Sequence, residues 1–143
     1  MSKNWVSDIV EMQGKYGTRD WVNSASVDKL KAFLEFRLSF IKEEFDETQK
    51  AVSEQDPEEI VDGLIDLCVV AIGTLDAFGV DPYKAWDAVH KANMAKVVGV
   101  KPSRPNVLGM PDLIKPTQET HGWDWVAPSH EGNHGILPEL KGE

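Results

Sequence analysis

The sequence predicts an all-α protein, a bundle of four to five helices followed by an irregular tail. Three observations favour this class. Apolar residues recur at helical spacing in four successive segments, and two helix-start signals, Asp56-Pro57 and Asp81-Pro82, divide that region. No segment alternates apolar and polar residues convincingly, so we expect no sheet larger than a small hairpin. With 143 residues, the chain can bury one modest core.

The N-terminal part is expected to form a short helix and then a long one. The apolar periodicity places the short helix at about residues 4–15, and a loop is expected from Gly17 to Ser24. Either Ser26 or Asp28 can cap the long helix, whose apolar stripe should continue to about residue 53 or 54.

A strong start signal opens the third helix. Asp56 is a good N-cap, Pro57 suits the first turn, and Glu59 takes the reciprocal capping-box position. After Asp66 this helix is apolar around most of its circumference, which is more than three other helices of one small chain can cover. We therefore expect a homodimer or homotetramer whose interface completes the bundle, with a compact monomer covered by its own tail as the alternative.

The composition changes after the fourth helix, which should begin at Asp81-Pro82 and fade near Lys96 or Val97. Six of the eight prolines and six of the eleven glycines lie from Val98 onward. We therefore expect a helical catalytic domain over residues 1–97. Residues 98–143 should form an extended tail that packs on the bundle or on a neighbouring subunit.

The charge balance narrows the class of partner. Twenty-four acidic residues against 15 basic ones, a net charge of −9, argue against a nucleic-acid-binding surface, so a phosphate ligand would need metal ions. Cys68 lies among apolar residues and is expected to be a buried, reduced thiol. No segment resembles a membrane span or a signal peptide, so we expect a soluble cytoplasmic protein.

Two acidic clusters, one on each of the second and third helices, are the best clue to function: Glu43, Glu44, Glu47, Glu59, Asp62 and Asp66. Spacings of three and four place carboxylates of one helix on one side of it. A turn centred near Gln55 would bring Glu44 level with Asp66 and Glu47 level with Gly63. Carboxylates that close repel one another unless a cation lies between them, and hard oxygen ligands suit Mg²⁺ or Mn²⁺.

The alternative interpretation of these acids is a solvated run of surface charge. It suits Glu58 and partly suits Glu59, because a helix N-terminus favours negative charge. It does not suit Asp66, whose neighbours are Gly63, Leu64, Ile65, Leu67 and Cys68, since a charge in apolar surroundings is costly unless it is paired or metal-bound. The sequence therefore predicts a metal site.

The acidic pattern resembles that of the all-α nucleoside triphosphate pyrophosphohydrolases, which include MazG, the dimeric dUTPases and phosphoribosyl-ATP pyrophosphohydrolase. The family pattern is EExxE, a short spacer and then ExxD. Residues 43–47 match the first part, and Glu59 with Asp62 matches the second part literally. A gap-free comparison with MazG instead aligns Asp66 with the family's aspartate and Gly63 with its glutamate.

The resemblance implies a MazG-like bundle that cleaves a nucleoside triphosphate between its α- and β-phosphates, giving a monophosphate and pyrophosphate. Glu43 would take a proton from a water bound to Mg²⁺ or Mn²⁺, with two or more ions present. Glu59 would be an outer or capping residue. Four carboxylates would hold the ions: Glu44, Glu47, Asp62 and Asp66.

Two further segments extend the resemblance. AWDAVHKANMAKV is similar to a family segment in which an asparagine and a lysine follow the acidic hairpin, so Asn93 and Lys96 would grip the triphosphate and Lys96 would stabilise the leaving pyrophosphate. The tail segments GVKPSRPNVLGMPDLIKP and WVAPSHEGN resemble the phage MazZ-like branch of dGTP/dATP pyrophosphohydrolases. A purine deoxynucleotide is therefore the expected substrate.

Other functions remain open at this point. Within the same superfamily, the chain can instead be a dUTP- or dCTP-directed pyrophosphatase, or a phosphoribosyl-ATP pyrophosphohydrolase. Outside the enzymes, it can be a helical interaction module whose acidic hairpin docks a basic partner or stores a structural ion. The isolated carboxylate at Asp66 and the Asn93–Lys96 pair count against the module.

Overall fold

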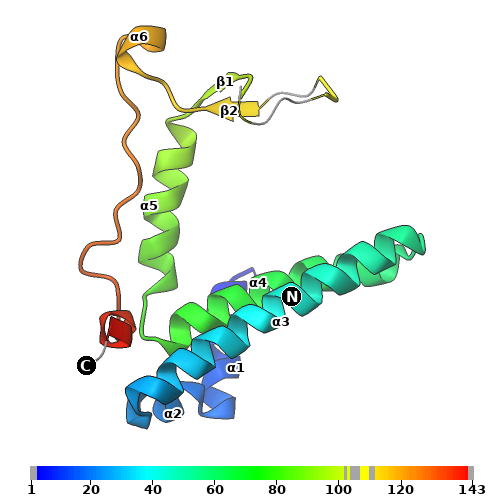
Figure 1. The fold of residues 1–143 in the computed structure, drawn as a ribbon, viewed down its shortest axis with the longest axis vertical. Coiled ribbons are helices and arrows are strands. Elements are labelled where there is room, and N and C mark those ends of the chain that lie inside the picture. The colour runs from blue at the N-terminus through cyan, green and yellow to red at the C-terminus, as the bar shows by residue number, and fades with distance from the viewer. Residues whose placement is uncertain (1–2, 102, 104–106, 110–111, 142–143) are drawn as a thin grey trace. The chain divides into compact units, whose positions relative to one another are not determined.

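The computed structural model describes residues 3–101, 103, 107–109 and 112–141, and it is mostly helical (Figure 1). The chain divides into two compact units, one formed by Met1–Pro82 with Gly132–Glu143 and the other by Tyr83–Glu131. The predicted all-α class is confirmed. The described elements, in chain order, are α1 (Trp5–Tyr16), α2 (Thr18–Ser24), α3 (Val27–Ser53), α4 (Pro57–Ala77), α5 (Pro82–Met94), β1 (Val97–Gly99), β2 (Asp112–Ile114), α6 (Gln118–His121) and the 3₁₀ helix η1 (Leu137–Lys141).

The loop expected after the first helix is wrong, because α2 occupies it. Asn4 caps α1, its Oδ1 accepting from the Ser7 N–H at 3.1 Å. Gly17 then adopts the left-handed conformation, with φ of 68°, and both ends α1 and precedes α2. A single residue therefore redirects the chain, and Val22 of α2 becomes fully buried.

The predicted acidic hairpin is formed by α3 and α4, which lie side by side (Figure 1). Ser26 caps α3, so the first of the two expected caps is the one used. At the other end, the N–H of Gln55 donates to Val52 at 3.1 Å and that of Asp56 donates to Ala51 at 2.9 Å. This is a Schellman turn, with Gln55 at the left-handed position (φ 57°) that glycine usually occupies. The turn is centred where the sequence placed it.

Asp56 caps α4 as expected, since its Oδ1 accepts from the Glu59 N–H at 3.2 Å. Its own N–H is committed to Ala51, so the reciprocal half of the expected capping box is replaced by the Schellman bond. Pro57 takes the first helical position, where the missing N–H costs nothing.

The core of the first unit joins both ends of the chain. Its largest fully buried side chains, Val22, Leu30 and Phe78, come from α2, α3 and the end of α4. The C-terminal segment packs against them through Ile136, Leu137 and Leu140.

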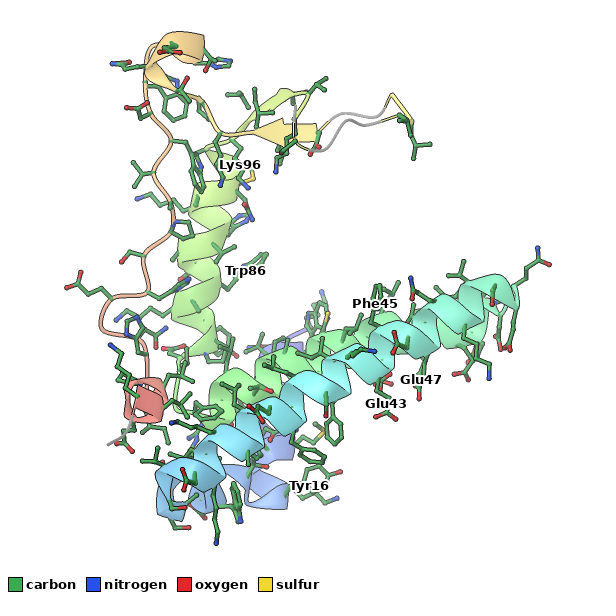
Figure 2. The ribbon with its side chains drawn as sticks, in the orientation of Figure 1. Tyr16, Glu43, Phe45, Glu47, Trp86 and Lys96 are labelled. Atoms are coloured by element: carbon green, nitrogen blue, oxygen red, sulfur yellow. The ribbon has the colours of Figure 1, made fainter. Side chains whose placement is uncertain are left out.

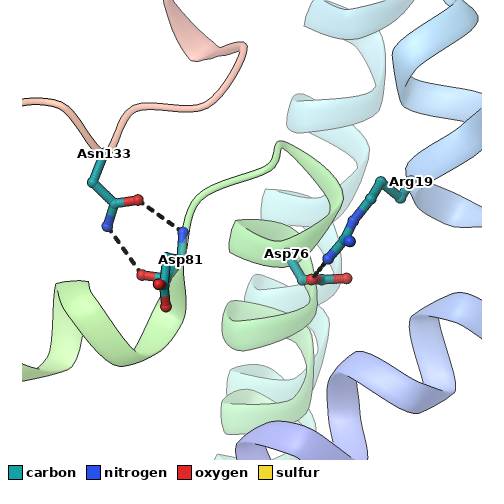
Figure 3. Close-up of polar contacts among 4 residues, drawn as sticks. All are labelled: Arg19, Asp76, Asp81 and Asn133. Atoms are coloured by element: carbon teal, nitrogen blue, oxygen red, sulfur yellow. Dashed lines mark hydrogen bonds and ion pairs between the residues drawn. The ribbon is translucent and has the colours of Figure 1, made fainter.

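Two polar contacts secure this end of the first unit (Figure 3). An ion pair joins Arg19 of α2 to the buried Asp76 of α4. The Asn133 amide accepts from the Asp81 N–H at 2.8 Å and donates to the Asp81 carbonyl at 3.0 Å. The side chain of Asn133 therefore pairs with the backbone between α4 and α5 as a neighbouring strand would.

The second unit contains α5, a small antiparallel ribbon and α6. The ribbon pairs Val97 with Ile114, and so meets the expectation of nothing larger than a small hairpin. Trp125 lies against the end of α5, where its indole N–H donates to the Ala92 carbonyl at 2.6 Å. Part of the tail segment compared with the MazZ-like branch, residues 102, 104–106 and 110–111, lies outside the described residues.

A single chain leaves much of the α3/α4 pair uncovered. Val61 and Leu64 of α4 are 64% and 53% exposed, and Phe36 and Phe45 of α3 are also more than half exposed. No single helix in the described part of the chain is long and apolar enough to span a membrane; α4 and α5 reach that length and composition only as a pair.

Candidate functional site

The contact between α3 and α4 determines how their carboxylates meet. Gly63 of α4 lies directly against Thr48 of α3, and a Cβ at position 63 would come within 3.3 Å of the Thr48 Cβ. Thr48 is fixed in turn, because its hydroxyl donates to the Glu44 carbonyl at 2.7 Å. At this register, Glu44 and Asp66 are close enough for their charges to interact.

Electrostatic coupling shows which of the predicted carboxylates come together. Burial raises the pKa of Glu44, and the negative charge of Asp66 raises it further. Smaller contributions to the same rise come from Glu47, Glu43 and Asp62. The structure therefore brings together five of the six acids, from two helices, around Glu44.

Asp66 is the second perturbed carboxyl. Burial raises its pKa, followed by the charge of Asp62 and by a hydrogen bond with the Asp62 side chain. Two carboxyl groups can share a hydrogen bond only if one of them holds a proton. Asp62 and Asp66, one helical turn apart, are thus close enough to share a proton.

Glu43 and Glu47 project from the same side of α3, whereas Phe45 lies on another side of the helix (Figure 2). This arrangement supplies carboxylate oxygens alone, the donors that Mg²⁺ and Mn²⁺ prefer. In the described part of the chain, no three His, Cys, Asp or Glu side chains are already drawn together tightly enough to enclose a metal ion. The donor set and the mutual repulsion of the acids both fit a divalent cation.

Glu59 and Asp66 differ in setting. Glu59 is exposed in the first turn of α4 and does not contribute to the raised pKa of either Glu44 or Asp66. Asp66 is half-buried rather than deep in apolar surroundings, because the neighbouring Leu64 and Ile65 are exposed in the single chain.

The nearby basic residues do not neutralise the cluster. Lys42 pairs with Asp46 on the exposed side of α3, at 2.9 Å. Arg37 instead crosses to α4, where its Nε donates to the Thr74 hydroxyl at 2.9 Å and its Nη2 donates to the Val70 carbonyl at 3.2 Å. Burial lowers the pKa of this guanidinium. Among the residues that the structure describes, no ion pair thus compensates the negative charge of the carboxylates around Glu44.

Asn93 and Lys96 belong to the second unit. Both lie at the C-terminal end of α5, where the Lys96 N–H donates to the Asn93 carbonyl at 3.1 Å. The Lys96 ammonium lies 5.4 Å from the centroid of the Trp125 ring. Trp86, which Figure 2 labels on the same helix, stacks on His90.

The structure also reveals a cavity that the sequence did not predict. It has a volume of about 280 Å³ and is lined by α1, α2 and α4, with Gln13, Gly14, Arg19 and Asp76 among its walls. Gln13 is 3% exposed, and within the described residues its Oε1 atom has no hydrogen-bond partner. Asp76, isolated among apolar residues of α4, carries the same signal that singled out Asp66 and could have been found with it.

Comparison with known proteins identifies one matching family model. Residues 23–93 match the family model of phosphoribosyl-ATP pyrophosphohydrolase. The matched segment, about half of the chain, contains the whole α3/α4 hairpin with its acids and ends at Asn93. No curated protein and no solved structure gives a significant match.

Proposed function

Because this chain belongs to the MazG-like all-α nucleoside triphosphate pyrophosphohydrolase superfamily, we propose that it hydrolyses a nucleoside triphosphate between the α- and β-phosphates. The products are a nucleoside monophosphate and pyrophosphate. The observation that carries this proposal is the α3/α4 hairpin, which brings carboxylates of both helices together around Glu44. Burial and the neighbouring carboxylates raise the pKa of Glu44 and of Asp66, and no ion pair of the described residues involves this group.

Four carboxylates are assigned to the divalent ions in this proposal: Glu44, Glu47, Asp62 and Asp66. Bound Mg²⁺ or Mn²⁺ would supply charge neutralisation for the phosphates and a lower pKa for water. Glu43 takes the proton as the water oxygen bonds to phosphorus and the bridging bond breaks. Glu59 stays outside this group, which agrees with its making no contribution to the raised pKa of Glu44 or Asp66.

Asn93 and Lys96 are assigned to the triphosphate. A lysine ammonium acts on phosphate as a compact point charge with three donors, and an asparagine amide adds a neutral donor. Lys96 also stabilises the charge that collects on pyrophosphate as it leaves. The half-buried position of both side chains at the end of α5 supports this role.

We assign the base of the substrate to the cavity beside Gln13. Its volume of about 280 Å³ is just below the range typical of small-molecule sites, about 300–1,000 Å³, so it suits a part of a ligand. Gln13 offers an unused acceptor, while Arg19 and Asp76 add a donor and an acceptor at the wall. Such groups suit the polar edge of a base. The preference for dGTP or dATP rests on the resemblance of the tail to the MazZ-like branch.

We also propose that the working protein is a homodimer or homotetramer. The uncovered apolar side chains of α3 and α4, among them Phe36, Val61 and Leu64, support a second copy of the bundle as the cover. A Leu64→Glu variant should shift the mass measured by light scattering towards the monomer, whereas a Val107→Glu variant in the exposed tail should not. A monomeric wild-type protein would contradict the proposal.

The free thiol of Cys68 suits the cytoplasm, where nucleotides are made.

The test of function is pyrophosphate release from a panel of NTPs, dNTPs and phosphoribosyl-ATP, with Mg²⁺, with Mn²⁺ and with EDTA. Metal-dependent release led by dGTP or dATP is expected. Release led by dUTP, dCTP or phosphoribosyl-ATP would keep the reaction and overturn the purine assignment. No release from folded, metal-loaded protein would favour the interaction module, which binds metal through the same acids without hydrolysis.

A further inference from the structure

Two lysines of the second unit share one aromatic ring. The ammonium group of Lys96 lies 5.4 Å from the centroid of the Trp125 ring, and that of Lys115 lies 4.9 Å from it. Trp125 is held through its ring and through its backbone: its indole N–H donates to the Ala92 carbonyl at 2.6 Å, and its backbone N–H donates to the Pro116 carbonyl at 2.8 Å. The two cations are thus held near a fixed platform.

The register of the ribbon explains how the lysines meet. The antiparallel ladder ends at the pair of Val97 and Ile114, so Lys96 and Lys115 are the residues that directly flank this last pair. Both ammonium groups lie against the ring of Trp125, and like charges held close to one another repel. Among the described residues, neither ammonium group forms an ion pair with a carboxylate. Within the described part of the chain, the lysine pair therefore has no carboxylate counter-ion.

Positive charge is also more abundant, relative to negative charge, in the second unit than in the rest of the chain. Residues 83–131 carry six Lys or Arg and five Asp or Glu, whereas the rest of the chain carries nine and nineteen. The second unit is therefore slightly cationic within a protein of net charge −9. Local positive charge in an acidic protein favours a small anion over an extended polyanion such as nucleic acid.

We infer that Lys96 and Lys115 together bind a diphosphate or triphosphate group, so that Lys115 is a second phosphate-binding residue opposite Lys96. Polyphosphates carry several charges on adjacent phosphates and can accept hydrogen bonds from both ammonium groups at once. The identification of this anion as part of the substrate, or as the pyrophosphate product, rests on the proposed function. The binding of an anion by the two lysines is independent of the proposed function.

The test measures binding of inorganic pyrophosphate and tripolyphosphate by isothermal titration calorimetry in EDTA, so that metal at the acidic hairpin does not contribute. Lys115→Gln and Lys96→Gln should each raise Kd about tenfold, the loss expected for one charge-assisted contact. Lys115→Arg should keep most of the affinity because it keeps the charge. Lys91→Gln, at an exposed lysine of α5, is the matched control and should bind as the wild type does.

The outcomes separate this inference from the proposed function. Wild-type affinity for pyrophosphate in Lys115→Gln, with a loss in Lys96→Gln, would show that Lys115 is not part of the site. An equal loss of affinity in Lys91→Gln would show that pyrophosphate responds only to the general positive charge of this unit. If no nucleotide is hydrolysed but pyrophosphate still binds through Lys115, only the proposed function fails. If nucleotides are hydrolysed and Lys115→Gln leaves both KM and inhibition by pyrophosphate unchanged, only the lysine pair fails.

Discussion

Gly63 of α4 packs against Thr48 of α3 with no room for a side chain at position 63. The Thr48 hydroxyl that occupies this space also donates to the carbonyl of Glu44. One contact thus fixes both the distance between the helices and the local backbone of an acid in the cluster. Asp62, the neighbour of Gly63, and Asp66, one turn further along α4, owe their approach to Glu44 to this closeness.

Gly63→Ala should destabilise the protein, although alanine is the better helix former by about 1 kcal/mol. The added methyl displaces Thr48 and separates the helices, so Mn²⁺ affinity should fall as well. Gly14→Ala, in α1, meets no atom within 4 Å and should raise the free energy of unfolding by about 0.5–1 kcal/mol. Adding Thr48→Ala to Gly63→Ala should restore part of the loss. Urea denaturation of the four proteins checks this, and equal behaviour of the two glycine variants would contradict it.

Asp66→Asn should stabilise the metal-free protein at neutral pH. The folded-state pKa of Asp66 is raised, so the folded state binds more protons than the unfolded state above the ordinary carboxyl range, near pH 4. Stability is therefore lost as the pH rises from that range through the folded pKa. In EDTA, the variant should have a Tm higher by about 2 °C at pH 7.5, with the difference vanishing towards pH 4.

Bound Mn²⁺ should reverse the order of the two melting temperatures, so that the wild type becomes more stable than Asp66→Asn. Mn²⁺ binds the folded wild type and raises its Tm by mass action, whereas Asp66→Asn gains less because a ligand is missing. Glu58→Gln, on the exposed first turn of α4, serves as the control and should gain no stability from losing its charge. A wild-type Tm that rises with pH in EDTA relative to Asp66→Asn would contradict the proposed charge crowding.

The assignment of ligands predicts unequal effects along α4. Asp66→Asn and Asp62→Asn should each lower kcat/KM by more than about 100-fold, with the helical circular dichroism unchanged, because they remove metal ligands. Glu59→Gln should cost less than about tenfold, since Glu59 lies outside the coupled group. Glu59→Gln as damaging as Asp66→Asn would mean that the literal ExxD match, not the hairpin register, identifies the ligands.

Gln55→Gly should stabilise the hairpin. Gln55 has φ of 57° at the left-handed position of the Schellman turn, where a side chain is unfavourable by about 1 kcal/mol. The free energy of unfolding should therefore rise by about 0.5–1 kcal/mol in urea denaturation, with an unchanged m-value. Gln55→Ala keeps the Cβ and should show no such gain. An equal gain in the free energy of unfolding for Gln55→Gly and Gln55→Ala would mean that the gain does not come from the backbone conformation at position 55.

Gln13→Met tests the cavity assigned to the base. Removing the unpartnered Oε1 should leave the ligand-free protein as stable as before or more stable, because a buried acceptor without a partner is costly. KM for the preferred nucleotide should rise about tenfold with kcat little changed. Gln49→Met, at an exposed position of α3, should alter neither quantity. An unchanged KM in Gln13→Met would remove the base from this cavity.

Local signals predicted the parts of the fold that local interactions determine. Ser26 and Asp56, two of the expected caps, both cap helices, and the turn at Gln55 places Glu44 level with Asp66. The missed helix α2 depends on Gly17 turning the chain within one residue, which composition alone does not distinguish from a loop.

The remaining features depend on contacts between distant residues. Asp81 and Asn133 are 52 residues apart, and Ala92 and Trp125 are 33 apart. No periodicity or spacing links such pairs. Lys115 could not be placed beside Lys96 without the register of the ribbon, and the cavity at Gln13 needs three helices to exist.

The docking of Ile136, Leu137 and Leu140 onto Val22 and Phe78 has a consequence for synthesis. A ribosome delivers the α3/α4 hairpin long before it delivers these last apolar residues, so the nascent first unit stays incomplete while more than fifty residues are added. During that interval, Phe78 and Leu30 lack their final cover. Closure of the core therefore waits for these later residues, and until they dock the emerging hairpin can be bound by chaperones.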